Sequence, residues 1–164
     1  MLLLVAGYET TANLISTAAY NLLDRPELLE AVRSDSTLIK AVIEETLRFD
    51  TPVPITARVA TADVELPGGT VEKGETVIVA MIAANRDPEA FDDPNTFSID
   101  RESSKHLGFA HGAHFCIGAN LARAEASAGI QALLERSPVL EGEAKWSESF
   151  ANRGISYLPV TFRS

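Results

Sequence analysis

The first 23 residues of the chain predict a helix that is apolar on nearly every side. Leucine, isoleucine, valine and alanine fill most positions of residues 1–23, and Gly7, Thr10 and Thr11 interrupt them. A helix that is hydrophobic all round is stable only where other elements surround it. We therefore expect this helix to be buried on all sides and to end before Pro26, because proline cannot continue a helix.

The remaining segments predict further helices and a small sheet. Periodicity and capping signals indicate helices at Glu27–Arg33, Ser36–Phe49 with Ser36 as N-cap, Met81–Asn85 and Ala119–Arg136. Alternating apolar residues indicate antiparallel strands within Thr56–Ala80, around the turn Pro67-Gly68-Gly69, and terminal strands at Val139–Leu140 and Ile155–Phe162. The expected fold class is mainly α with a small antiparallel β-sheet (α+β).

Composition excludes several classes of protein. The formal net charge of the 164 residues is -9, which argues against nucleic-acid binding, since that needs a basic face, and against docking on an anionic membrane. A single cysteine excludes an internal disulfide and indicates a cytoplasmic location. The apolar run Met1–Ala6 is too short to span a bilayer and lacks the basic residues and cleavage site of a signal peptide.

The only cysteine lies in a glycine-punctuated loop just before the last long helix. The loop reads Phe109-Ala110-His111-Gly112-Ala113-His114-Phe115-Cys116-Ile117-Gly118. A metal-binding thiolate must be held still and deprotonated, and the positive end of a helix favours a nearby anion by about 0.3–1 kcal/mol. Gly112 and Gly118 permit tight backbone turns, and Phe109 offers an apolar wall to a flat cofactor. Taken alone, a lone cysteine is more often a small core residue.

The spacing Phe-x-x-Gly-x-x-x-Cys-x-Gly resembles the haem-binding loop of the cytochrome P450 family. The resemblance implies that Cys116 is the axial thiolate ligand of the iron of a haem b. The other cofactor contacts that it implies in this loop are Phe109, Gly112, His114 and Gly118. His114 stands where the family has a basic residue and would meet a haem propionate, whereas Ala110 stands where glycine is common.

The first helix carries a second motif that is similar to one of the same family. Ala6-Gly7-Tyr8-Glu9-Thr10-Thr11 resembles the oxygen-activation motif, small-Gly-x-acid-Thr-Thr. The resemblance implies that Ala6 and Gly7 let the helix pass close over the cofactor, and that Glu9 and Thr10 relay protons. A threonine hydroxyl can bond to the carbonyl four residues earlier and bend the helix. The plainer alternative is a Gly-Thr helix interface beside a solvated glutamate.

Two further arginines have counterparts in the family. Glu45 and Arg48 would by themselves be a surface ion pair, but they resemble the structural Glu-x-x-Arg pair that braces the haem-binding loop. The family adds an arginine at the place where this chain has Thr96, so we expect a two-member brace or one that uses the Thr96 hydroxyl. Arg58 is implied to pair with a haem propionate, the alternative being a surface arginine.

The three histidines divide between the loop motif and the surface. His106 and His111 have no counterpart with a role in the family and are expected on the surface or in the loop. A zinc site is disfavoured, because His111, His114 and Cys116 lack a second pair of ligands at the spacing of structural zinc.

These motifs span the chain in the family's order, although the chain has under half of the family's usual length. We expect residues 1–164 to be a single C-terminal haem-binding portion of the P450 fold, from the oxygen-activating helix onward, without the N-terminal half. The implied activity is a monooxygenase that inserts one oxygen atom of O2 into a small organic substrate. A ferredoxin or flavoprotein would deliver electrons from NAD(P)H, and the candidate docking residues are Arg101, Lys105 and Arg123.

The alternative is a truncated, non-catalytic module. Such a chain would bind haem weakly or dimerise, because both long helices carry apolar faces that need a partner. Either a complementing N-terminal half or self-association through these helices would cover them.

Overall fold

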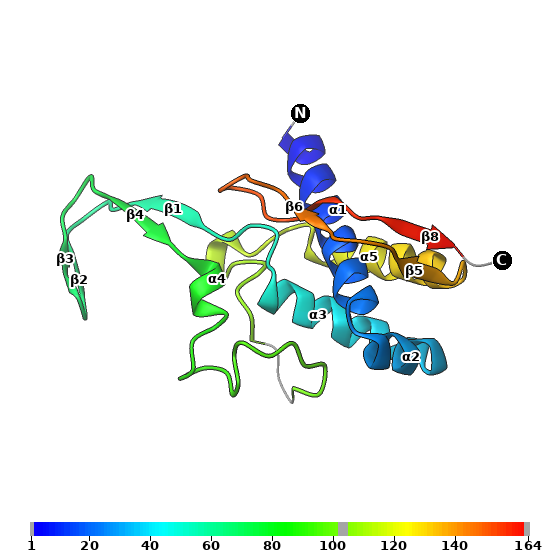
Figure 1. Cartoon of the computed structure of the whole chain (residues 1–164). Helices are drawn as coiled ribbons and strands as arrows, with labels where there is room; N and C mark the ends of the chain where they lie inside the picture. Colours follow the sequence, from blue (N-terminus) through cyan, green and yellow to red (C-terminus); the bar gives the residue numbers. More distant parts are fainter. Residues whose placement is uncertain (1, 102–104, 163–164) are drawn as a thin grey trace.

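The computed structural model describes residues 2–101 and 105–162 (Figure 1). Its helices are α1 (Leu2–Leu23), α2 (Pro26–Ser34), α3 (Ile39–Phe49), α4 (Met81–Ala84) and α5 (Ala119–Leu134), with 3₁₀ turns η1 (Ser36–Leu38) and η2 (Gly112–His114). Its strands are β1 (Thr56–Val59), β2 (Val64–Leu66), β3 (Gly69–Val71), β4 (Thr76–Val79), β5 (Pro138–Leu140), β6 (Lys145–Trp146), β7 (Ile155–Tyr157) and β8 (Val160–Phe162). The described strands pair antiparallel, as β1–β4, β2–β3, β5–β8 and β6–β7. The expected α+β class is confirmed.

Helices α1, α3 and α5 pack together to form the core. The buried apolar side chains that they share include Leu14, Ala18 and Leu22 of α1, Val42, Ile43 and Leu47 of α3, and Ala126 and Ile130 of α5. Gly129 of α5 lets α1 approach closely, since a β-carbon there would lie 3.3 Å from the side chain of Ile15. The small residues of the last long helix therefore serve close packing at these positions, as predicted.

The expectation that α1 is buried on all sides is wrong for residues 6–9. Residues 6–9 are exposed, with Tyr8 at 77%, whereas Leu14 and Ala18 are almost fully buried. The reason is that the start of α1 extends past the body of the molecule (Figure 1). None of the described helices is long and apolar enough to cross a bilayer.

Two local features differ from the sequence-based predictions. Asp35, and not Ser36, caps the turn before α3, because its carboxylate accepts hydrogen bonds from Thr37 N (2.9 Å) and Thr37 Oγ1 (2.6 Å). Strand β6 was not predicted, since two residues are too few to show an alternating pattern. Trp146 of β6 packs edge-on against Tyr20 of α1, with ring centroids 5.8 Å apart.

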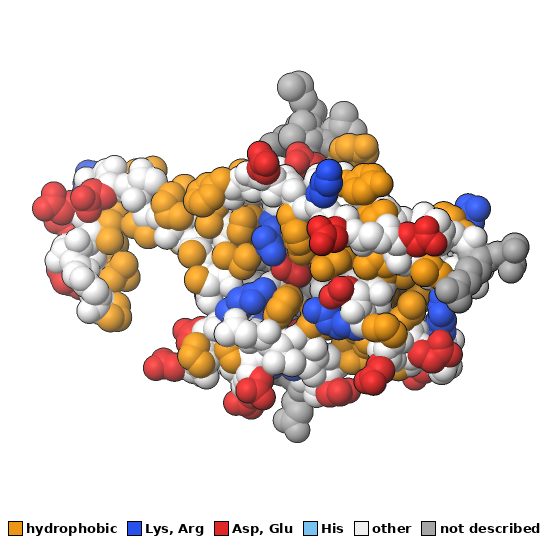
Figure 2. Space-filling view, viewed as in Figure 1, with side chains coloured by type: hydrophobic (Ala, Val, Ile, Leu, Met, Phe, Trp, Pro, Cys, Tyr) orange, Lys and Arg blue, Asp and Glu red, His pale blue; other side chains and the backbone are white. Residues whose placement is uncertain are grey.

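Strands β1 to β4 form an arm that projects from the helical body (Figure 1). Thr56 pairs with Val79 at the base of the arm, and the β2–β3 hairpin forms its tip. Figure 2 shows apolar side chains along the arm, where Val59 is 62% and Ile78 is 56% exposed. The arm thus contributes little to the core, but its base carries Thr56 and Arg58 next to the helical body.

The segment that contains β6 and β7 docks on α1 and on the end of α3. Arg153 donates through Nη2 to the buried Asp50 carboxylate (2.9 Å) and through its backbone N–H to the carbonyl of Pro52 (2.8 Å). Asn21 of α1 donates to the same carboxylate (3.3 Å). Gly154 packs so closely on α1 that a β-carbon there would overlap the Asn13 side-chain amide.

We predict that Gly154→Ala lowers the free energy of unfolding by about 1–3 kcal/mol, because the added methyl group overpacks the contact with Asn13. Urea unfolding followed by far-UV circular dichroism measures the loss. Gly68→Ala is the matched control, since a β-carbon in that exposed turn meets nothing within 4 Å. Equal losses in the two variants would contradict the packing explanation.

Candidate functional site

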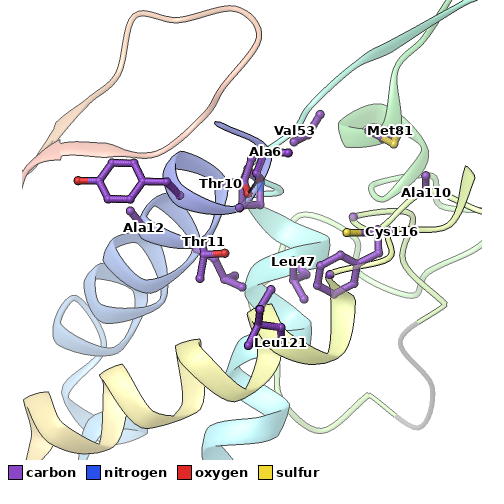
Figure 3. Close-up of a pocket in the computed structure, with 18 of the residues that line it drawn as sticks. Ala6, Thr10, Thr11, Ala12, Leu47, Val53, Met81, Ala110, Cys116 and Leu121 are labelled. Carbon is purple, nitrogen blue, oxygen red and sulfur yellow. Dashed lines mark hydrogen bonds between the residues drawn. The ribbon is translucent and has the colours of Figure 1, made fainter. Parts of the chain in front are cut away.

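A cavity of about 790 Å³ lies between α1, the base of the arm and the loop that carries Cys116 (Figure 3). Its volume falls within the roughly 300–1,000 Å³ typical of small-molecule and cofactor sites. The residues singled out from the sequence that line it are Ala6, Gly7, Thr10, Arg58, Phe109, His114, Cys116 and Gly118. Glu9 and Gly112 are exposed and do not line it. Residues brought together from distant parts of the chain therefore share one cavity.

The wall formed by α1 carries the motif of small residues and threonines. Thr10 donates through Oγ1 to the carbonyl oxygen of Ala6 at 2.7 Å, which is the hydrogen bond expected from a threonine to the preceding turn. Figure 3 shows Ala6 and Thr10 on one side of the cavity and Cys116 on the other, with its sulfur directed into the space between them. Glu9 lies on the exposed side of the same turn.

The loop holds Cys116 through its backbone. Cys116 is half-buried, and its N–H donates to the carbonyl of Phe109 at 2.9 Å. The N–H of Ala119 in turn donates to the carbonyl of Cys116 at 3.2 Å, so the cysteine lies directly before the N-terminus of α5. Cys116 thus has the position before the long helix that the sequence predicts.

Two positions of the loop have a left-handed backbone, and a glycine just before the loop is required by close packing. Gly112 has φ +67° and Ala110 has φ +59°, both in the left-handed region that favours glycine. Gly118 has φ −86°, so the predicted need for glycine conformation at that position is wrong. Sequence reasoning missed Gly108, where a β-carbon would lie 2.7 Å from the carbonyl oxygen of Leu47. Its only signal is a glycine at the entry to the loop.

Glu45 and Arg48 form a buried pair and not a surface one. Arg48 Nε and Nη2 each donate to the Glu45 carboxylate at 2.7 Å, and both side chains are at most 3% exposed. Arg48 also donates to the carbonyl oxygens of Asn85 (2.8 Å), Pro94 (2.8 Å) and Thr96 (3.0 Å). The pair thus ties α3 to the irregular segment that precedes the cysteine loop.

The third member of this brace is Arg101. The expectation that Glu45 and Arg48 act alone, or that the Thr96 hydroxyl joins them, is therefore wrong. Arg101 Nε donates to Glu45 Oε1 at 3.2 Å, and Nη2 donates to the carbonyl of Thr96 at 2.8 Å. Arg101 also bonds to the carbonyls of Asp92 and Asp93, because the chain curls back on itself there. The fold of this segment therefore brings Arg101, five positions after Thr96 in the sequence, into contact with Glu45 and with the Thr96 carbonyl.

A second charged cluster lies beside the first, around Glu44. Arg123 Nε (2.6 Å) and Nη2 (2.9 Å) donate to its carboxylate, and His106 Nε2 lies 3.1 Å from it. Burial opposes ionisation of Glu44, but the hydrogen bonds from Arg123 and His106, together with the charge of Arg123, lower its pKa from 4.5 to about 2. Because the folded pKa is lowered, the ionised carboxylate stabilises the fold above about pH 4.5, and this contribution is lost as the pH falls toward 2.

This cluster corrects two predictions. The His106 side chain is 3% exposed and bonded to Glu44, so it is not a surface histidine; His111 is exposed, as expected. Arg101 is 13% exposed and paired with Glu45, which disfavours it as a docking residue, whereas Arg123 is paired with Glu44 but remains 34% exposed. Among the three docking candidates, Lys105 alone is exposed.

The chemistry of the cavity suits a flat, largely apolar cofactor that carries carboxylates. Its walls include Leu47, Val53 and Leu121, and a potential thiolate lies on one side. Two basic side chains that can donate to carboxylates, Arg58 and His114, are exposed at its margin. Arg58 Nη1 donates to Thr56 Oγ1 (2.9 Å) and to the carbonyl of Ala57 (2.7 Å). These donors fit a haem.

The sequence pattern that describes the cytochrome P450 family matches residues 1–161. The chain belongs to the cytochrome P450 family. It is 46% identical to the cytochrome P450 monooxygenase PikC of Streptomyces venezuelae over 99% of this chain and 40% of PikC. It is 44% identical to the biotin biosynthesis cytochrome P450 of Bacillus subtilis over 99% of this chain and 42% of that protein. This P450 chain therefore spans about two-fifths of the length of these curated relatives.

Solved P450 structures share the fold. P450BioI, in complex with an acyl carrier protein that carries hexadec-9Z-enoic acid, matches 99% of this chain with a TM-score of 0.94 and 44% identity; the match covers 43% of that structure. CYP109E1 from Bacillus megaterium, in complex with testosterone, matches 99% of this chain with a TM-score of 0.96 and 38% identity, over 46% of its own length. The comparisons of sequence and of structure thus agree on the P450 fold.

We predict that Ala110→Gly raises the free energy of unfolding by about 1 kcal/mol, because alanine at φ +59° is strained and glycine is not. Ala113→Gly is the matched control in the same loop. Ala113 lies in η2, so glycine there should lower the free energy of unfolding by about 0.5–1 kcal/mol. Urea unfolding measures both, and a shift of the same sign in the two variants would contradict the assignment of strain to Ala110.

Proposed function

We propose that residues 1–164 are the C-terminal haem-binding portion of a haem-dependent monooxygenase, with Cys116 as the thiolate ligand of the iron. The enzyme would insert one oxygen atom of O2 into a small organic substrate. The observation that carries the proposal is the cavity itself, where Cys116 lies opposite the Ala6–Thr11 motif. Membership of the P450 family supports the same reaction class.

The residues around the cavity would divide the task of holding haem b. Cys116 would bind the iron, with its backbone fixed by Phe109 and by the start of α5. Arg58 and His114 would donate to the propionates. Ala6, Gly7, Phe109 and Gly118 would border the macrocycle, since they line the cavity, and Gly112 would shape the loop from outside it. When bound, a thiolate-ligated haem supplies dioxygen binding and O–O bond cleavage.

Protons would reach the cavity along α1. Thr10 Oγ1 holds a proton on the cavity side, where it is bonded to the carbonyl of Ala6. Glu9 precedes it and is exposed, so its carboxylate can exchange protons with solvent. In this proposal Glu9 takes up protons from outside and Thr10 passes them inward, through water or by rotation of its hydroxyl.

The electrons would come from NAD(P)H through a ferredoxin or flavoprotein. The single cysteine supports a cytoplasmic location for this reaction. With Arg101 and Arg123 engaged in ion pairs, Lys105 is the exposed docking candidate of the three. PikC is a monooxygenase by name, and P450BioI is seen with an acyl carrier protein.

A non-catalytic, self-associating module is the second candidate, and one observation favours it. Several apolar side chains near the cavity are exposed, among them Ile117 (94%), Tyr8 (77%) and Leu121 (63%). Apolar surface of this kind needs a cover, either the remainder of a P450 fold or a second copy of the chain. Haem binding without oxygen activation, combined with dimerisation in sedimentation experiments, would favour this second candidate.

We predict that the chain reconstituted with haem, reduced and exposed to carbon monoxide, gives the red-shifted Soret band of thiolate ligation. Cys116→Ala should abolish that band, because the chain has no other cysteine. His111→Ala is the control, since His111 is exposed in the same loop and does not line the cavity. Failure of the unaltered chain to take up haem, or an unchanged band in Cys116→Ala, would reject the assignment of the ligand.

We also predict that Thr10→Ala, in the haem-loaded protein supplied with electrons, increases the fraction of consumed oxygen that is released as hydrogen peroxide. The reason is the loss of the hydroxyl that passes protons into the cavity. Thr10→Ser keeps a hydroxyl at this position and should remain close to the unaltered protein. An unchanged peroxide fraction in Thr10→Ala would remove Thr10 from the proton path.

A further inference from the structure

Two neighbouring carboxylates leave α3 in different directions and hold different parts of the chain. Successive residues of a helix point about 100° apart, and the partners of the two glutamates differ accordingly. Glu45 binds Arg48, Arg101 and the N–H of Ser98, so it holds the segment well before the cysteine loop. Glu44 binds His106 and Arg123, which lie on either side of that loop.

The partners of Glu44 enclose the whole loop. His106 precedes it and Arg123 belongs to the second turn of α5, directly after it. One carboxylate therefore connects the entry of the loop to its exit, and anchors both to α3. The Glu45 brace does not reach either end, because its partners stop at Arg101.

On the entry side, the hydrogen bonds define which nitrogen of His106 carries the proton. Nδ1 accepts a hydrogen bond from the N–H of Gly108 at 3.0 Å, so the neutral ring carries its proton on Nε2 and donates it to Glu44 at 3.1 Å. Gly108 also lies against the carbonyl of Leu47. Glu44 thus orients the ring that fixes the first turn of the loop.

On the exit side, Arg123 connects Glu44 to the cysteine through one aromatic residue. Its guanidinium lies 4.5 Å from the centre of the Phe109 ring, a cation–π contact, and the carbonyl of Phe109 accepts the N–H of Cys116. These two contacts bring the positive charge of Arg123 to the side of the loop that carries Cys116. Glu44 balances this positive charge.

We propose that Glu44 is a positioning residue for Cys116. Glu44 connects the two ends of the loop through His106 and Arg123, and its negative charge balances the positive charge of Arg123 beside Phe109. The inference rests on the proposed role of Cys116 as the iron ligand. Glu44 would thus have a mechanical effect, which limits opening of the loop, and an electrostatic effect, which alters the reduction potential of the haem iron. The two effects can be separated by substitution.

The mechanical effect is tested in the chain without haem, by hydrogen exchange of the Gly108 and Cys116 amides. Glu44→Gln weakens two charge-assisted bonds, so both amides should exchange about tenfold faster. Glu27→Gln, which removes a charge from the exposed face of α2, is the control and should leave them unchanged. If the Gly108 and Cys116 amides exchange at unchanged rates in Glu44→Gln, Glu44 does not connect the two ends of the loop. This conclusion holds whatever the outcome with haem.

The electrostatic effect is tested by the reduction potential of the haem-loaded protein. Removal of a negative charge favours the reduced iron, so Glu44→Gln should raise the potential, Arg123→Gln should lower it, and the double variant should return it toward the original value. Glu44→Asp keeps the charge but shortens the side chain. The Gly108 and Cys116 amides should therefore exchange faster in this variant, with little change in the reduction potential of the haem. If the reduction potential shifts in the same direction in Glu44→Gln and Arg123→Gln, the substitutions act only by loosening the loop. That result would overturn the proposed electrostatic effect of Glu44.

The two tests also separate this inference from the proposed function. If the unaltered chain binds no haem through Cys116, the proposed ligand is wrong, and hydrogen exchange alone then decides whether Glu44 closes the loop. If haem binds and the exchange rates do not respond to Glu44→Gln, the ligand stands and the role of Glu44 fails.

Discussion

The guanidinium of Arg48 is wholly buried and donates hydrogen bonds to Glu45 and to three backbone carbonyls. A charge in that position is stable only if every donor is satisfied, and removal of either partner of such a pair typically costs about 3–5 kcal/mol. The carbonyls of Pro94 and Thr96 belong to a segment with no helix or strand of its own. The segment that leads to the cysteine loop is therefore shaped by this charge and only weakly by local backbone preferences.

Glu44 and Glu45 divide the support of the loop between two environments. The Glu45 side chain is 3% exposed and the Glu44 side chain 29% exposed, so solvent and salt screen the second cluster much more than the first. The inner cluster gives the segment its shape, and the outer one connects the ends of the loop. The outer cluster persists in mild acid, because Arg123 and His106 hold the pKa of Glu44 at about 2.

Most helices and the motif residues of the cavity could be predicted from the sequence, because their signals are local. The Cys116 loop and the Ala6–Thr11 motif have fixed spacings, and eight of the ten predicted site residues line one cavity. Arg101 and His106 were misjudged for a different reason: their environment is decided by where an irregular segment folds back, and no periodicity reports that. The exposure of α1 near Tyr8 was missed because an apolar helix does not indicate which of its turns the neighbouring elements reach.

The arm formed by β1 and β4 has a consequence for how the chain behaves in solution. In the described part of the chain, each of these strands pairs with only one neighbour, so each presents an outer edge of unpaired N–H and C=O groups. Val59 and Ile78 expose apolar side chains on the faces of the arm, and no proline lies between Thr56 and Val59 or between Thr76 and Val79 to block the edges. Such edges accept further strands, so the arm is a template for sheet extension, by the rest of a P450 fold or by aggregation at high concentration.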